Sequence, residues 1–600
     1  MPADKKIKTR KEIQNAYKWD IEAMYQDEDI WENDFTAVRE DAKKFVEYSG
    51  RLAEGSTVLF SALTDKDAIW QKAEKVYVYA RMKKDEDNTN GKYQGMCDRA
   101  NGLMAETAAQ LSFFTPEFLE ISEEKVDAFM NEESGLQIYS HYISDLLRQK
   151  AHILSKSEEN IMAQMSEITS ATNTIFSMIN NADMKFGMVI DEDGEETELT
   201  HGRYSGFMES QDRRVRKEAF TAMYAAYDKQ KNTLAATYNY NTKTDIVNAR
   251  IRKYGSSLLS ALDSDKIGQD VYDNLIDAVN DRLPLLHRYM EIRRRLLDID
   301  EVHMYDIYTP LVSDPFGKIK YEQGLEMLKK GLKPLGDEYI ANMENGLSSG
   351  WIDVYESKGK TSGAYSFGSF DSKPYILLNY QDKLKDVFTI AHEMGHSMHS
   401  FYTRKTQPFI YGGHSIFTAE VASTVNECLL MRQLLEESTN KAHKAYLLNM
   451  YIEEFRTTLF RQTMFAEFEK LTHETVEVGG VLTQDWLCSE YDALNRKYFG
   501  AKVAYDGQIA LEWARIPHFY NAFYVYKYAT GYSAAVALSE KILEEGEPAR
   551  LRYIEFLKSG ERDYPIELLK EAGVDMSSPA PVLKAMDTFE SLIEELEKIV

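Results

Sequence analysis

Long stretches of this chain place apolar residues three and four positions apart, and few prolines interrupt them. Residues 57–84 and 157–179 show this spacing, as amphipathic helices do. Only 13 of the 600 residues are proline, about 2% against a usual 5%. Because proline breaks the interior of a helix, its scarcity favours long helices over a large sheet. We therefore predict a mainly α-helical fold with a large helical body.

Two short segments depart from this helical pattern. Between residues 184 and 200, β-forming residues flank Asp193-Gly194, which indicates a hairpin. Between residues 355 and 380 glycine and serine are frequent, and the run KPYILLNY at 373–380 is extended in character. We expect a small sheet there, with 373–380 as an edge strand that pairs with an extended peptide. After residue 381 we expect helices to the end of the chain, including 439–473, 483–499, 517–545 and 579–598.

Charge and cysteine content exclude several classes of function. The chain has 71 basic and 97 acidic side chains, for a formal net charge of -26. This charge disfavours binding to nucleic acid or to an anionic membrane surface. No run of about 18 apolar residues occurs, and the polar N-terminus lacks the apolar core of a signal peptide. Cys97, Cys428 and Cys488 lack paired spacing. We therefore expect a cytoplasmic protein.

The segment 392–396 reads His-Glu-Met-Gly-His within a helical pattern. On a helix, residues four apart lie about 40° from each other around the axis, so His392 and His396 can converge on one metal ion. Glu393 projects about 60° from His396 and can reach an attacking water. This spacing predicts a catalytic zinc site with Glu393 as the general base. The alternative is a pair of exposed histidines on a helix surface.

A catalytic zinc site needs a third protein ligand and one open position. His399 lies one turn beyond His396, but a single straight helix rarely directs three imidazoles at one ion. We interpret His399 as a neighbour of the site or a surface residue, with metal coordination as the less favoured alternative. Tyr402 stands where metzincins have their third histidine, which excludes that class.

Glu420 is the better candidate for the third ligand. It lies 24 residues after His396, near the start of a second predicted helix that begins around residue 415. Glu427 follows seven residues later, within about 20° of Glu420 around that helix. This position suits an acceptor that fixes the imidazole N–H of a ligand histidine, although a solvated carboxylate is an equally good interpretation.

The two-part motif resembles the oligoendopeptidase F branch of the thimet oligopeptidase-like zinc peptidases. The resemblance rests on HEMGH at 392–396 and FTAEVASTVNE at 417–427. It extends to Trp19-Asp20 with Trp31, GAYSFGSFDSKPYILLNY at 363–380, IPHFYNAFYVYKYATGY at 516–532 and LLKEAGVDM at 568–576. It implies one zinc ion and helical lobes around a deep central cleft. It also implies internal cleavage of short peptides and exclusion of folded proteins.

The segment 516–532 is dense in side chains that donate hydrogen bonds. The family uses a histidine and tyrosines in this part of its chain, and its Tyr-x-x-x-Tyr pattern matches Tyr524 and Tyr528. We expect Tyr520 on the same helix face. His518 lies one residue further from the first tyrosine than in the thimet-type pattern. The resemblance implies that Tyr524, Tyr528 and His518 stabilise the oxyanion, and packing of these aromatic side chains in the core is the alternative.

The predicted organisation is an N-terminal helical lobe at 1–200, ending in the hairpin, and a zinc metallopeptidase region at 201–600. The predicted function is that of a zinc-dependent oligoendopeptidase acting on short, unstructured peptides. Two alternatives are a helical metallocarboxypeptidase with the same His-Glu-x-x-His motif and a catalytically silent metal-containing binding protein. Glu393 argues against the second alternative, because a structural metal site has no use for that carboxylate.

Overall fold

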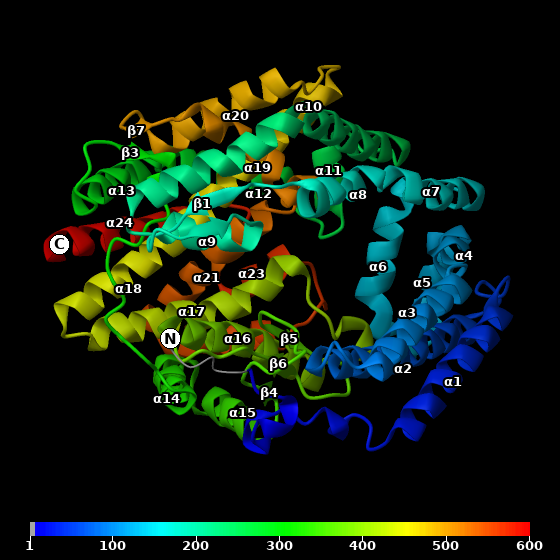
Figure 1. The fold of residues 1–600 in the computed structure, drawn as a ribbon. Coiled ribbons are helices and arrows are strands. Elements are labelled where there is room, and N and C mark those ends of the chain that lie inside the picture. Colours follow the sequence, from blue (N-terminus) through cyan, green and yellow to red (C-terminus); the bar gives the residue numbers. More distant parts are fainter. Residues whose placement is uncertain (1–6) are drawn as a thin grey trace. The chain divides into compact units, whose positions relative to one another are not determined.

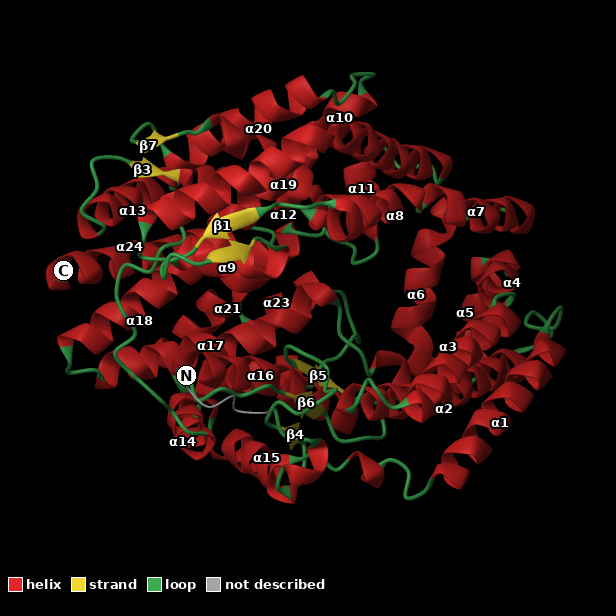
Figure 2. Cartoon of the chain, viewed as in Figure 1, coloured by secondary structure: helices red, strands yellow, loops and turns green. Residues whose placement is uncertain are grey.

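Helices make up most of the chain in the computed structural model, which describes residues 7–600 (Figure 2). Residues 1–6, the start of the polar N-terminal segment, lie outside the described residues. The chain forms two compact units, and each combines separate stretches of sequence. Unit 1 holds the described residues up to 156 together with 316–433 and 538–573, and unit 2 holds 157–315, 434–537 and 574–600. The boundary expected at residue 200 lies inside unit 2, and the division at that residue stays a prediction.

The N-terminal part of unit 1 is a helical layer in which α1, α2 and α3 pack against one another (Figure 1). The indole N–H of Trp31 in α1 donates to the carbonyl of Val76 in α2 at 2.9 Å, so the buried ring keeps a hydrogen bond. The helices of unit 1 are α1 (Glu28–Phe45), α2 (Ser56–Glu86), α3 (Gly91–Leu111), α4 (Phe114–Glu120), α5 (Glu123–Glu132), α6 (Ser140–Gln149), α14 (Tyr321–Gly331), α15 (Asp337–Ser348), α16 (Leu384–Thr406), α17 (Ile416–Glu437), α22 (Glu547–Leu557) and α23 (Pro565–Ala572). The last residues of α17, beyond 433, belong to unit 2.

The small sheet expected at 355–380 is present in unit 1, but its strand order differs from the prediction. Strands β4 (Ile352–Asp353), β5 (Tyr365–Phe367) and β6 (Tyr375–Leu377) form a sheet in the order β4-β6-β5. β6 is parallel to β4 and antiparallel to β5, so its backbone groups are paired on both sides. The prediction that 373–380 is an edge strand is therefore wrong, because residues 352–353 occupy the side that an added peptide would need. β5 is an edge strand of this sheet.

Unit 2 is also helical and contains the predicted hairpin. Strands β1 (Met188–Ile190) and β2 (Glu196–Glu198) pair antiparallel, and Gly194 in the turn has φ +82°, which glycine adopts without strain. Two further short strands, β3 (Val302–His303) and β7 (Val503–Ala504), pair in parallel. The helices of unit 2 are α7 (Lys156–Thr169), α8 (Ala171–Met178), α9 (His201–Glu209), α10 (Arg213–Ile251), α11 (Ser257–Asp263), α12 (Gln269–Asp281), α13 (Leu283–Leu296), α18 (Lys441–Glu454), α19 (Arg461–Glu477), α20 (Gln484–Phe499), α21 (Tyr526–Glu545) and α24 (Ala580–Ile599). The first residue of α7 and the residues of α21 beyond 537 belong to unit 1.

The helix expected across 517–545 is broken in the structure. A short 3₁₀ helix covers Pro517–Tyr520, and α21 begins only at Tyr526. Between them Phe523 has φ +56°, a left-handed conformation that a right-handed helix cannot contain. The mainly helical fold with small sheets is confirmed. Within the described part of the chain, no helix is long and apolar enough to cross a lipid bilayer.

Candidate metal centre

Helix α16 carries the His-Glu-x-x-His segment, and its sequence explains how it begins. Asp386 sits in the first turn, and its carboxylate accepts the backbone N–H groups of Gln381 at 2.8 Å and Lys383 at 2.9 Å. These bonds satisfy donors that a helix start leaves without a partner, and the negative charge suits the positive end of the helix dipole. Val387 and Ile390 are fully buried, which anchors the helix within unit 1. The helix is thus fixed at the segment that presents the two histidines.

A close contact between α16 and α17 brings the third candidate ligand into place. At Gly395 an added Cβ would lie 2.5 Å from the Cα of Ser423 and 2.6 Å from the carbonyl oxygen of Ala422. Only glycine permits this approach of two helix backbones. Asn426 adds a direct link, because its amide donates to the carbonyl of Ala391 at 3.1 Å. The position of α17 relative to the two histidines is therefore set by glycine packing and a buried amide.

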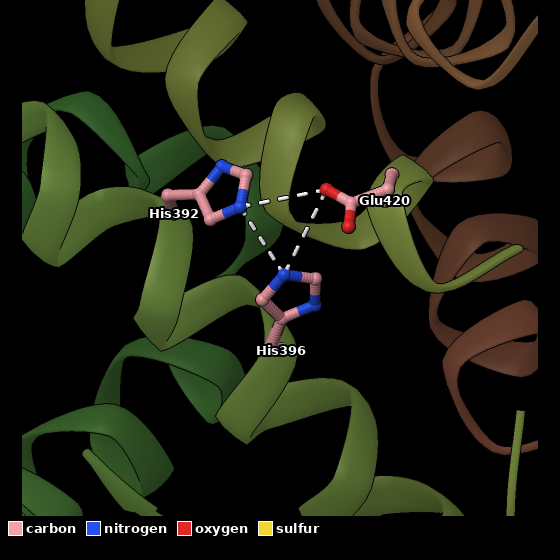
Figure 3. A group of neighbouring side chains, drawn as sticks. All are labelled: His392, His396 and Glu420. Atoms are coloured by element: carbon pink, nitrogen blue, oxygen red, sulfur yellow. Dashed lines mark hydrogen bonds and ion pairs between the residues drawn. The ribbon is translucent and has the colours of Figure 1, made fainter. Parts of the chain in front are cut away.

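His392, His396 and Glu420 direct one atom each at a common point, as Figure 3 shows. The two imidazole Nε2 atoms are 3.2 Å apart, and Oε2 of Glu420 lies 3.5 Å from Nε2 of His392 and 3.9 Å from that of His396. All three side chains are partly exposed. Two imidazole nitrogens and one carboxylate oxygen form a donor set that suits zinc and leaves a coordination position open.

Glu427 supports the first histidine from the side opposite the candidate metal position. Its Oε2 lies 3.2 Å from Nδ1 of His392, which fixes a proton on Nδ1 and leaves Nε2 to bind a metal. Burial lowers the pKa of His392, but the hydrogen bond and charge of Glu427, with Glu393 and Glu420, outweigh burial and raise that pKa to about 9. Burial and the charges of His392 and His414 lower the pKa of His396 to about 3.

Glu393 is buried beside this group and is not part of it. Its side chain lies within unit 1 with 8% of the residue exposed. The pKa of Glu393 is raised to about 7, mainly by burial and further by the negative charges of Glu420 and Glu427. The charge of His392 and a backbone hydrogen bond from Ser366 in β5 act in the opposite direction and lower that pKa. A carboxyl group with a pKa near neutral accepts and returns a proton readily at physiological pH.

His399 does not lie on the surface, so that part of the prediction is wrong. It is 1% exposed and stacks on His414 with ring centroids 4.0 Å apart. Among the described residues, the group that could hold a metal consists of the two motif histidines and Glu420, and it excludes His399. Sequence reasoning missed His414, because a histidine after two glycines in a loop carries no recognisable motif. In the folded chain, the loop that carries His414 packs against α16 beside His399.

The aromatic residues predicted to act on the oxyanion cluster in unit 2. The rings of Tyr524 and Tyr528 are 5.4 Å apart, edge to face, and His518 lies 6.5 Å from the first and 6.0 Å from the second. Tyr520 is separate from them, because it stacks on Phe176 of α8 at 4.3 Å. The expectation that Tyr520 shares a helix face with Tyr524 is wrong, since the break before α21 separates them.

Comparison with known proteins extends over nearly the whole chain. Residues 206–588 match the family model described as peptidase family M3, and residues 117–186 match one described as oligopeptidase F. Oligopeptidase PepF of Bacillus subtilis (strain 168) is 46% identical over 591 residues, which cover 98% of this chain and 88% of that protein. An oligoendopeptidase F homolog of Lactococcus lactis subsp. lactis (strain IL1403) is 42% identical over 99% of both chains. The crystal structure of oligoendopeptidase-F from Enterococcus faecium superposes with a TM-score of 0.75 at 37% identity, covering 95% of this chain and 99% of that one.

Proposed function

Since this chain belongs to peptidase family M3, we propose that it hydrolyses internal bonds of short, unstructured peptides. The enzyme is a zinc metallo-oligoendopeptidase with one catalytic zinc ion. The observation that carries the proposal is the convergence of three ligand atoms, from His392, His396 and Glu420, next to the buried carboxyl group of Glu393. A silent binding protein would not need that carboxyl group.

Each residue of the site has a separate role in peptide hydrolysis. When bound, a zinc ion supplies a Lewis acid that polarises the scissile carbonyl and activates water. Glu393 takes a proton from the attacking water and then transfers it to the leaving amine nitrogen. A pKa of about 7 suits both transfers, because neither direction is strongly uphill near neutral pH. Glu427 holds the Nδ1–H of His392 and so keeps its Nε2 available as a ligand.

We assign stabilisation of the oxyanion to Tyr524 and Tyr528, with His518 as a further donor. Phenol and imidazole groups donate hydrogen bonds, and one well-placed donor contributes about 100- to 1000-fold in rate. Support comes from the mutual ring contacts of these three residues and from the resemblance of 516–532 to the family pattern. The test is loss of turnover in Tyr524→Phe, which keeps the ring and removes the hydroxyl.

Strand β5 is the candidate site for pairing with the substrate backbone. It is an edge strand, and the backbone of its central residue, Ser366, bonds to the Glu393 carboxyl group. An extended peptide that pairs with an edge strand gains main-chain hydrogen bonds that do not depend on its sequence. This role replaces the one predicted for 373–380, whose strand lies in the middle of the sheet.

The central test uses a quenched fluorescent peptide with and without a zinc chelator, and the variant Glu393→Gln. The amide keeps the shape of the side chain but cannot take up the proton, so we expect full zinc content and turnover reduced by about 100- to 10,000-fold. Mass spectrometry of the products separates an endopeptidase from a carboxypeptidase, because only the latter releases single residues from the C-terminus. Retained activity in Glu393→Gln would contradict the mechanism.

Substrate length is the second test. We propose that the active site admits only extended chains of roughly 5 to 20 residues, at about 3.3 Å per residue. A folded protein would first have to unfold, at a cost of about 5–15 kcal/mol. The same scissile sequence is placed in a short peptide, in a peptide with long Gly-Ser tails and in the exposed loop of a folded domain. Equal rates for all three would overturn the proposal that the active site admits only extended chains.

We also infer a cytoplasmic location. The net charge of -26 gives no attraction to anionic lipid. No disulfide joins Cys97, Cys428 and Cys488, as expected in a reducing compartment. Fractionation of cells that produce the protein tests this inference.

A further inference from the structure

The turn between the 3₁₀ helix Pro517–Tyr520 and α21 contains a strained residue. Phe523 has φ +56°, a left-handed conformation that is strained for a residue with a Cβ. Glycine or asparagine would adopt this conformation more easily. Other contacts must therefore hold Phe523 in place.

Two sets of contacts hold Phe523. The residue is 2% exposed, and its ring packs between those of Tyr272 in α12 and His473 in α19, with ring centroids 5.8 Å and 4.5 Å away. Its backbone N–H donates to Oε1 of Glu469 at 3.1 Å. Without that oxygen the buried N–H would lose its partner, which is unfavourable for a buried donor. The ring contacts hold the side chain, and Glu469 holds the backbone.

Glu469 is an energetically unfavourable residue at this buried position. It lies on α19, is 0% exposed, and its Oε2 has no hydrogen-bond partner among the described residues. Burial raises the pKa of Glu469 well above its usual value, because burial disfavours the charged form of a carboxyl group. An apolar side chain of similar volume would fill the space without the cost of an unpaired oxygen. The bond to Phe523 is the one hydrogen bond described for this side chain that offsets the cost.

The residue that follows Phe523 is Tyr524, so the backbone of the turn determines where its phenol lies. The carbonyl of Tyr524 accepts the N–H of Lys527 at 3.2 Å, at the start of α21, and its ring lies 5.4 Å from that of Tyr528. A turn relaxed at Phe523 would rotate the peptide unit that leads into Tyr524. A shift of about 1 Å in a catalytic donor is enough to cost about 100-fold in rate.

We propose that Glu469 is a positioning residue, which acts on the reaction through the Phe523 backbone and the Tyr524 phenol. The inference rests on the proposed role of Tyr524 at the oxyanion. It assigns to a buried carboxyl group, distant in sequence from both the metal ligands and the tyrosines, a role in turnover. The role does not depend on a charge, because only one oxygen is used.

The test compares Glu469→Gln with Glu469→Met. The glutamine keeps an oxygen for the Phe523 N–H, so kcat should stay within about twofold of the wild type. The methionine has similar length and no strong acceptor, so kcat should fall about 10- to 100-fold, with KM and zinc content unchanged. The matched control is Thr463→Val, a buried change on the same helix; within the described part of the chain, the Thr463 hydroxyl donates to the carbonyl of Leu459. It should keep the wild-type kcat.

A double variant separates this inference from the proposed function. Tyr524→Phe alone tests the role of the phenol. If Glu469 acts through Tyr524, then Glu469→Met should cause no further loss of kcat in the Tyr524→Phe background. Additive losses, a wild-type kcat in Glu469→Met, or a low kcat in Glu469→Gln would each overturn the positioning role. Because Glu469→Gln is expected to fold, the proposal remains testable if the methionine variant does not.

Discussion

Replacing Gly395 with alanine should separate the two helices that form the metal centre. The added Cβ would lie 2.5 Å from the Cα of Ser423 and 2.8 Å from its backbone nitrogen. Ordinary carbon contacts begin near about 3.5 Å, so the backbones must move apart by about 1 Å. Metal–ligand distances tolerate only about 0.2 Å. The change therefore moves Glu420 beyond the range of a bond to an ion held by His392 and His396.

We expect Gly395→Ala to weaken zinc binding at least about 10-fold and to destabilise the protein by about 1–3 kcal/mol through overpacking. Zinc affinity is measured by competition with a chromogenic chelator, and stability by the thermal midpoint of the zinc-free protein. The matched control is Gly102→Ala in α3, where an added Cβ meets no atom within 4 Å. That change should leave zinc binding intact and stabilise the helix by about 1 kcal/mol. Wild-type zinc affinity in Gly395→Ala would refute the helix-contact reasoning.

Further predictions concern the other ligands and one buried carboxylate. Glu420→Ala should lower zinc occupancy in elemental analysis while His399→Ala keeps it, and the reverse result would overturn the ligand assignment. Glu427→Ala should lower zinc affinity or activity about 10- to 100-fold. A change below twofold would contradict the role of Glu427 in orienting the His392 imidazole. Burial alone would raise the pKa of Glu512. The nearby guanidinium groups of Arg461, whose Nη2 lies 2.7 Å from Oε1 of Glu512, and Arg515 outweigh burial and lower that pKa to about 2, below the usual 4.5. The ionised Glu512 therefore stabilises the folded protein fully above pH 4.5, and this stabilisation is lost as the pH falls towards 2. The difference in free energy of unfolding between the wild type and Glu512→Gln should shrink by about 3 kcal/mol over that range, as measured by pH-dependent thermal melts. A constant gap would contradict this.

The short-range part of the site could be predicted from sequence. Residues 392–396 lie within little more than one turn of a helix, and the regular geometry of a helix sets the directions of their side chains. The same holds for the hairpin, where Asp193-Gly194 specifies the turn. Glu420 and Glu427 could be proposed because seven residues on one helix return to the same face.

The errors all involve contacts between distant segments. Whether 373–380 lies at an edge depends on residues 352–353, which pair with it from outside the run. The burial of His399 depends on a loop histidine 15 residues away. The break before α21 depends on a buried acceptor on another helix, Glu469, which makes a left-handed Phe523 tolerable.

The sequence by itself therefore determined the chemistry of the centre: which residues can bind zinc, which can move a proton, and that the chain is helical. Backbone hydrogen bonds within one helix are local, so their consequences can be deduced from spacing alone. Only the tertiary structure decided how close α17 lies to α16, which strand forms the edge of the sheet and how Tyr524 is presented. Those outcomes depend on side chains that meet across long stretches of chain, where removing one methyl group, as at Gly395, changes the distance between two helices.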